Sequence, residues 1–164
     1  MSVLSEGAAE AAGSEAAGSE AAGAQESRAR GWRALAALHA LIEVGVERAL
    51  AAHGLSVSEY AVLDALSRQD DWHMRMQQLA DAVVLSQSAT TRLVTRLEAD
   101  GLLSRRLCAT DRRGIYTEVT DAGRERLEQA RPTHDAALRR ALAAAADLPG
   151  LAPLVHALDL VPAT

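Results

Sequence analysis

Apolar residues recur every three or four positions between residues 32 and 50, which is the spacing of an amphipathic helix. They are Trp32, Leu35, Leu38, Ile42, Val46, Ala49 and Leu50. We expect this helix to stop at His53-Gly54, because glycine commonly ends helices in the left-handed conformation. A second helix is expected to begin at Ser58, with Glu59 in its first turn.

Residues 74–106, MRMQQLADAVVLSQSATTRLVTRLEADGLLSRR, predict two short helices that are joined by a very short turn. We place the first at about 75–84. The second begins after Ser86, which can cap its first turn, and ends at Asp100-Gly101. Two short helices with a tight turn between them form a helix-turn-helix.

Two strand-like stretches follow, LLSRRLCA at 102–109 and IYTEVT at 115–120, with the turn residues TDRRG at 110–114 between them. The pattern therefore predicts a two-stranded β-wing directly after the helix-turn-helix. Adjacent strand positions point to opposite faces, so we expect one of Arg105 and Arg106 to contact phosphates and the other to pair with a carboxylate.

The C-terminal part returns to a helical pattern at Thr120-Asp121, which should cap a further helix. Pro132 lies inside this pattern and is expected to kink or break the helix. Helical character then continues to about residue 146, and residues 151–161 predict a short apolar helix at the end.

The first 27 residues differ from the rest in composition. They contain EAAGSEAAGSEAAG at 10–23, whose glycines oppose helix and whose alanines bury little. We therefore expect a disordered tail rich in Ala, Gly, Ser and Glu, in which transient helix can form. This tail holds five of the 22 acidic residues and no Lys or Arg, which leaves 17 acidic and 17 basic residues in the remainder. The net charge of −5 therefore belongs to the tail.

Basic charge concentrates in residues 86–113. This stretch contains six arginines and only three acidic residues, Glu98, Asp100 and Asp111, which leaves a local excess of three positive charges. Placed every 100° around the helix that follows Ser86, the polar side chains gather on one side, opposite the apolar ones. Those that we expect to contact DNA are Gln87, Ser88, Thr91, Arg92, Thr95 and Arg96. Arginine can pair bidentately with guanine, and Gln, Ser and Thr can reach base edges or phosphates. The alternative interpretation of these polar side chains is an ordinary solvated helix face that contacts no DNA.

The wing adds a second expected contact, since Arg112 and Arg113 at its tip can enter the narrow minor groove. The chain then divides into a disordered tail at 1–27, a dimerisation helix at 28–55, a winged helix-turn-helix DNA-binding lobe at 56–120 and C-terminal dimerisation helices at 121–164. The expected fold class is mainly α with a small β-wing.

These residues resemble the multiple antibiotic resistance regulator (MarR) family of bacterial winged-helix repressors. The likeness rests on LADAVVLSQSATTRLVTRLEADGLLSRR, DRRGIYTEVT and DAG, and it spans roughly residues 30–160. The family wing pattern is Asp-x-Arg, five residues, then Leu-Thr. Here Asp111-Arg112-Arg113 is followed after five residues by Val119-Thr120, with Val for Leu as the one departure.

The resemblance implies a homodimer whose terminal helices intertwine and whose two lobes bind the half-sites of a pseudo-palindromic operator in double-stranded DNA. It also implies that Asp111 positions the wing through a salt bridge with Arg113 or another nearby arginine. A small-molecule effector, frequently an aromatic anion in this family, would bind in a cleft between the dimer helices and the DNA-binding lobe and weaken DNA binding. Trp32 and His39 are candidates to line such a pocket, although core or dimer packing suits Trp32 better.

Cys108 is the single cysteine, which excludes an intrachain disulfide and fits a reducing, cytoplasmic compartment. The arginines around it could lower its thiol pKa, so a redox-responsive regulator is one alternative function, while an inert strand cysteine is the more ordinary interpretation. A winged helix that binds protein is another alternative. We expect no cofactor, no metal site and no membrane span, and the motifs of common enzymes do not occur.

Overall fold

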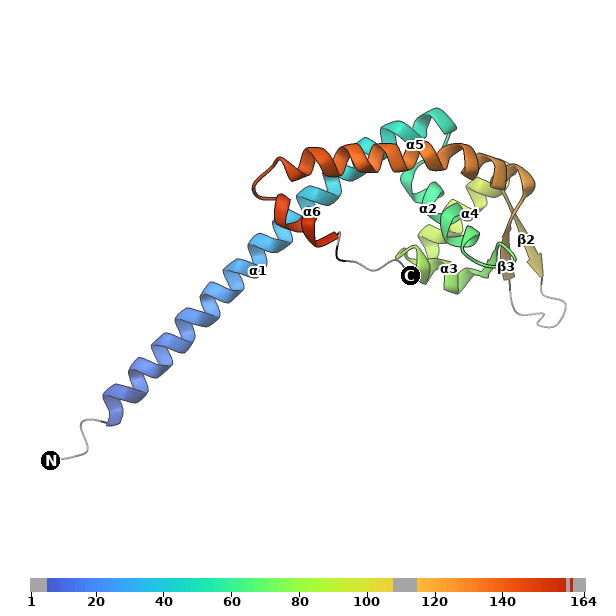
Figure 1. Cartoon of the computed structure of the whole chain (residues 1–164). Coiled ribbons are helices and arrows are strands. Elements are labelled where there is room, and N and C mark those ends of the chain that lie inside the picture. Colours follow the sequence, from blue (N-terminus) through green and yellow to red (C-terminus); the bar gives the residue numbers. More distant parts are fainter. Residues whose placement is uncertain (1–5, 108–114, 159, 161–164) are drawn as a thin grey trace. The chain divides into compact units, whose positions relative to one another are not determined.

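The computed structural model describes all residues except 1–5, 108–114, 159 and 161–164 (Figure 1). Its elements are α1 (Glu6–Leu50), the 3-10 helix η1 (Ala51–His53), α2 (Val57–Ser67), β1 (His73–Arg75), α3 (Met76–Ala82), α4 (Gln87–Ala99), β2 (Leu103–Leu107), β3 (Ile115–Val119), α5 (Asp121–Ala146) and α6 (Ala152–Leu158). The expected fold class, mainly α with a small β-wing, is confirmed. The chain forms two compact units, one of Met1–Leu41 with Ala144–Thr164 and one of Ile42–Ala143.

The N-terminal segment that the sequence assigns to a tail overlaps α1, which begins at Glu6 and continues without interruption to Leu50. Each EAAGS repeat supplies glutamate and two alanines, which favour helix, against one glycine and one serine. The assignment of residues 1–27 to a disordered tail stays a prediction. The expected end of the helical run is confirmed at Gly54, which has a φ of 67° and follows η1.

The start of α2 is set by Ser56, not by Ser58 as expected. The Ser56 hydroxyl accepts a hydrogen bond from the Glu59 amide, and the Glu59 carboxylate accepts one from the Ser56 amide at 2.9 Å. This reciprocal arrangement is a capping box, in which two otherwise unpaired amides at the helix start are satisfied.

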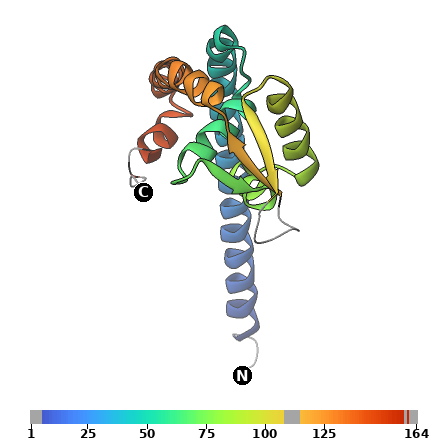
Figure 2. The ribbon, with the colours of Figure 1, turned by 90° about the vertical axis from the view of Figure 1, so that its right-hand side faces the viewer.

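The sheet has three strands in the order β1–β3–β2, with both neighbouring pairs antiparallel. β2 and β3 are the expected wing strands, and the sequence did not predict β1. In Figure 2 β2 and β3 run side by side and α4 lies next to β2. β1 was missed because three residues are too few to show an alternating pattern, so its pairing with β3 defines it.

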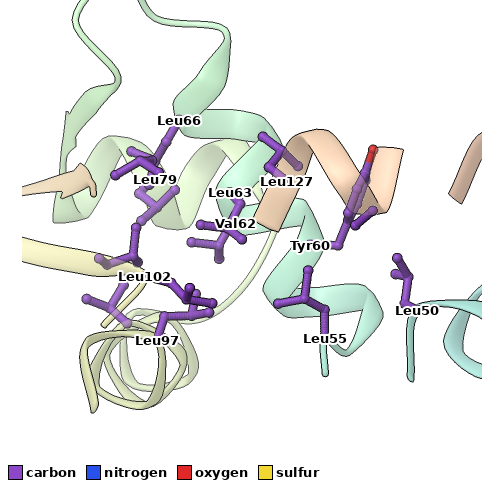
Figure 3. Packing of buried hydrophobic residues seen from close by; sticks show 14 of the residues in the cluster. Leu50, Leu55, Tyr60, Val62, Leu63, Leu66, Leu79, Leu97, Leu102 and Leu127 are labelled. Carbon is purple, nitrogen blue, oxygen red and sulfur yellow. The ribbon is translucent and has the colours of Figure 1, made fainter. Parts of the chain in front are cut away.

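The core of the Ile42–Ala143 unit lies between α2, α3, α4 and the sheet (Figure 3). Leu63, Leu66, Leu79 and Leu97 have no exposed surface. Segments that were assigned to dimerisation also belong to this core, since it includes the following residues of α1 and α5: Val46, Leu50, Leu127, Ala130 and Ala137. The compact unit is therefore larger than the 56–120 lobe that the sequence suggested.

α5 runs unbroken from Asp121 to Ala146 with Pro132 inside it, so the expected break is wrong. Proline removes one backbone donor. Leu127 and Ala130 before it and Ala137 after it are all buried in the core, and this packing holds both halves of the helix in place.

The start of α5 approaches the start of β2 very closely at Gly123, in the DAG sequence that follows the wing. A Cβ atom built on Gly123 would lie 2.2 Å from the Leu102 carbonyl oxygen and 2.8 Å from Val119 Cγ1. The Thr120 hydroxyl accepts a hydrogen bond from the Gly123 amide at 3.1 Å and donates one to the Gly101 carbonyl at 2.7 Å. Glycine is therefore required here by space and not by an unusual φ.

Candidate nucleic-acid interface

α3 and α4 form the expected helix-turn-helix, with the turn at residues 83–86. α3 ends at Ala82, two residues earlier than expected. Ser86 caps α4 as expected, because its hydroxyl accepts a hydrogen bond from the Ala89 amide at 3.3 Å. Val84 in the turn has a φ of 54° and is 89% exposed, a strained conformation for a β-branched residue.

α4 separates buried from exposed residues as its periodicity predicts. Thr90, Val94 and Leu97 are fully buried against the core. The six side chains of α4 that were predicted to contact DNA are all exposed, and we call them the outer face of α4: Gln87, Ser88, Thr91, Arg92, Thr95 and Arg96. Their exposure is required for base contact, and their role in DNA binding stays a prediction.

Hydrogen bonds within the helix-turn-helix order the first turns of the outer face. The Thr91 hydroxyl donates to the Gln87 carbonyl at 2.8 Å, which fixes the position of this side chain against its own helix. The Gln87 side-chain amide donates to the Gln77 side-chain carbonyl, and this bond joins α4 to α3. The start of α4 is thereby held in a defined orientation relative to the helix before it.

Arg96, near the end of the outer face, forms an ion pair with Glu59 of α2, whose carboxylate is 3.2 Å from Arg96 Nη1. The Glu59 side chain is only 6% exposed, whereas that of Arg96 is 67% exposed. Burial alone would raise the pKa of Glu59. The hydrogen bonds from Ser56 and the charge of Arg96 outweigh it and hold that pKa below its ordinary value. Glu59 is therefore ionised at neutral pH.

Both arginines of β2 are paired with carboxylates. Arg105 lies 3.1 Å from Glu98 and also donates to the Thr95 hydroxyl at 2.9 Å, so the wing sheet contacts the outer face directly. Arg106 lies 2.8 Å from Glu118 on β3. The expectation that one of these two arginines would pair with a carboxylate is thus met by both.

The remaining predicted residues are Cys108, Asp111, Arg112, Arg113, Trp32 and His39. Cys108, Asp111, Arg112 and Arg113 lie outside the described residues. Trp32 is 69% exposed on α1, and His39 is also exposed there, in the unit of Met1–Leu41 and Ala144–Thr164. Their assignment to an effector pocket stays a prediction.

Sequence reasoning missed the part that Glu59 plays, since it placed this residue only in the first turn of α2. The spacing Ser56-x-x-Glu59 is the capping-box pattern and could have located Ser56 and Glu59 correctly. No local pattern shows that Arg96 lies opposite Glu59, because the two residues are 37 positions apart.

The described part of the chain has neither a membrane-spanning helix nor a cluster of metal-binding side chains. Outside residues 1–5, 108–114, 159 and 161–164, no helix combines the length and the apolar character that crossing a membrane requires. Within the same ranges, no group of three or more His, Cys, Asp or Glu side chains is arranged to hold a metal ion.

Comparison with known proteins places this arrangement among transcriptional regulators. The family model described as MarR family matches residues 53–114. The HTH-type transcriptional regulator MhqR of Bacillus subtilis is 36% identical over 84 residues, which cover 51% of this chain and 57% of MhqR. The chain spans just over half the length of the curated relatives that it matches.

Solved structures extend the likeness. Sco3205, a MarR family transcriptional regulator from Streptomyces coelicolor solved in complex with DNA, is 32% identical with a TM-score of 0.64. The match covers 67% of this chain and 69% of that one. CouR from Rhodococcus jostii RHA1, solved with bound p-coumaroyl-CoA, is 31% identical with a TM-score of 0.60. Here the match covers 65% of this chain and 73% of CouR.

Proposed function

The chain belongs to the MarR family, and from this premise we propose that it is a DNA-binding transcriptional regulator. The observation that carries the proposal is the exposed polar face of α4, held on a packed helix-turn-helix beside the wing sheet. Sco3205, which shares this fold and is 32% identical over the matched region, was solved in complex with DNA. The curated relatives are also named as transcriptional regulators and not as enzymes, which supports the proposal.

α4 is the helix that we assign to the major groove. Its outer face has short hydroxyl side chains at Ser88, Thr91 and Thr95, which let a helix approach the base edges closely. Arg92 can reach a guanine edge, and Gln87 an adenine edge or a phosphate. We assign Arg112 and Arg113 to the minor groove and Asp111 to the positioning of the wing.

We infer a homodimer in which segments 28–55 and 121–164 supply the interface. The unit of Met1–Leu41 and Ala144–Thr164 holds most of the large apolar side chains that are exposed in the described chain: Trp32, Leu35, Leu148, Leu158 and Leu160. Exposed apolar surface of this kind is typical of oligomer interfaces. A twofold dimer presents two α4 helices to a pseudo-palindromic operator in double-stranded DNA, and repression follows if that operator overlaps a promoter.

A small-molecule effector completes the proposed mechanism. CouR, at 31% identity, was solved with p-coumaroyl-CoA, an anion that contains an aromatic group. We propose an effector of the aromatic-anion class, with Trp32 and His39 as the residues to test first. By binding one conformation of the dimer better than another, it would change the spacing of the two α4 helices and release the DNA.

Selection from a randomised duplex library tests the proposed function. The full chain should enrich one pseudo-palindromic sequence, bind it in a salt-dependent manner, and bind the DNA upstream of its own coding region if it regulates itself. Arg113→Ala should weaken binding by ~1–3 kcal/mol. If no sequence is enriched even at low salt, the chain is not a sequence-specific DNA-binding protein.

A further inference from the structure

The arginines around the outer face of α4 are, with one exception, already paired within the described part of the chain. The pairs are Arg96–Glu59, Arg105–Glu98 and Arg106–Glu118. Arg92 lies one helical turn before Arg96, is exposed, and has no ion pair among the described residues. Three of the four arginines of residues 86–107 are thus neutralised by carboxylates of the chain itself.

We propose that Glu59 is a specificity-determining residue: by holding Arg96 in an internal ion pair, it suppresses binding to arbitrary DNA and leaves Arg92 as the free cation of the outer face. The inference rests on the proposed function. It concerns how the surface distinguishes one sequence from another, and so it can fail while DNA binding itself holds.

The geometry explains why Glu59 keeps Arg96. One carboxylate oxygen, Oε2, accepts hydrogen bonds from the Ser56 amide and hydroxyl, both at 2.9 Å, so the carboxylate is fixed at the start of α2. The other oxygen, Oε1, faces Arg96 Nη1 at 3.2 Å. Because the carboxylate is buried, moving Arg96 away to a phosphate would leave an uncompensated charge in the protein interior. A DNA phosphate must therefore compete with Glu59, which has no cation other than Arg96 among the described residues.

Pairing of this kind lowers sequence-independent affinity more than sequence-specific affinity. Contacts between cations and phosphates supply essentially all of non-specific binding, and each adds about 0.9 to the slope of log affinity against log salt. An arginine whose charge is cancelled by Glu59 contributes little to that slope. Arg92 and the hydroxyl side chains around it can still pair with base edges, since these contacts depend on hydrogen-bond geometry.

The test uses the full chain and two duplexes, one that the wild type selects from a randomised library and one with the same bases scrambled. Glu59→Gln removes the charge but keeps the capping box, which accepts Gln in place of Glu. We expect this variant to bind the scrambled duplex roughly fivefold to tenfold more tightly, with a salt slope steeper by about 0.9. The ratio of the two affinities should fall by a similar factor, a change that a purely structural role for Glu59 does not produce.

Three further variants separate the causes. In Glu59→Gln with Arg96→Ala, the gain on scrambled DNA should disappear. Asp100→Asn removes a negative charge at the end of α4, the helix that carries Arg96. Asp100 has no side-chain partner among the described residues, so this variant should give less than half of the gain in affinity for scrambled DNA. Arg92→Ala should weaken binding to the selected duplex more than Arg96→Ala does.

The outcomes are distinguishable. If the wild type selects no sequence, the proposed function fails. If it selects one but Glu59→Gln leaves scrambled-DNA affinity and salt slope unchanged, the inference about Glu59 is overturned and the function stands. The gain in affinity for scrambled DNA could instead persist in the double variant, or Asp100→Asn could reproduce it in full. Either result would show that overall charge causes the gain and would overturn the part played by Arg96. Thermal unfolding of each variant confirms that it is folded.

Discussion

Replacing Gly123 with alanine should destabilise the protein, although alanine is the better helix former. The added Cβ would lie 2.2 Å from the Leu102 carbonyl oxygen, and the gap must open by about 0.8 Å to reach 3.0 Å, below which real Cβ contacts are hardly seen. The same carbonyl accepts the Thr120 amide at 3.1 Å, so opening the gap also strains this hydrogen bond. Both neighbours are structural, since Leu102 and Val119 are buried.

The expected magnitude follows from three contributions. Overpacking costs about 1–3 kcal/mol, a weakened backbone hydrogen bond costs about 1 kcal/mol, and the intrinsic helical preference of alanine returns up to about 1 kcal/mol. We therefore expect a loss of about 1–4 kcal/mol, or a fall in melting temperature of roughly 2–16 °C for a chain of this size. Urea unfolding measures the free energy, at one fixed protein concentration because the proposed dimer makes stability depend on concentration.

Gly31 provides the matched control, because it lies within α1 and a Cβ atom there meets nothing within 4 Å. Gly31→Ala should raise stability by about 0.5–1 kcal/mol through the helical preference of alanine. If Gly123→Ala is as stable as the wild type, or gains as Gly31→Ala does, the close approach of α5 to β2 is not what makes glycine necessary at this position.

Three other substitutions test local features of the winged helix. Val84→Asn should raise the free energy of unfolding by about 1 kcal/mol, because Val84 is exposed at a φ of 54° that asparagine tolerates better; an unchanged melting temperature would show that no strain is stored there. Ser86→Ala should lower it by about 1 kcal/mol through loss of the α4 cap, which urea unfolding would detect, while a neutral result would mean that the hydroxyl does not cap the Ala89 amide. The pKa of Glu59 is lowered in the folded state, so its stabilising effect is complete above the unfolded pKa of about 4.3 and is lost as pH falls through the folded pKa. Stability measured from neutral pH down to about pH 3 should therefore fall more steeply for the wild type than for Glu59→Gln, and parallel curves would contradict the lowered pKa.

Much of the fold follows from local patterns. The helical spacing of apolar residues, the capping residues Ser86 and Gly54, and the order of helix-turn-helix and wing all appear in the sequence and all recur in the structure. The outer face of α4 was also predictable, because a periodicity of 3.6 residues fixes which side chains share a side once the opposite side is known to be apolar. Such signals depend on neighbours within a few positions, which the sequence shows directly.

The tertiary structure decided what depends on distant segments. β1 exists because β3 pairs with it, α5 continues past Pro132 because the core holds both of its halves, and the DAG glycine is needed because Leu102 approaches it. The same holds for the candidate site. The sequence identified Arg96 as a cation free to meet DNA, and the packing of α4 on α2 placed it against the buried carboxylate of Glu59. A sequence shows which charges a chain carries, but whether a charge is available to a partner depends on which elements meet when the chain folds.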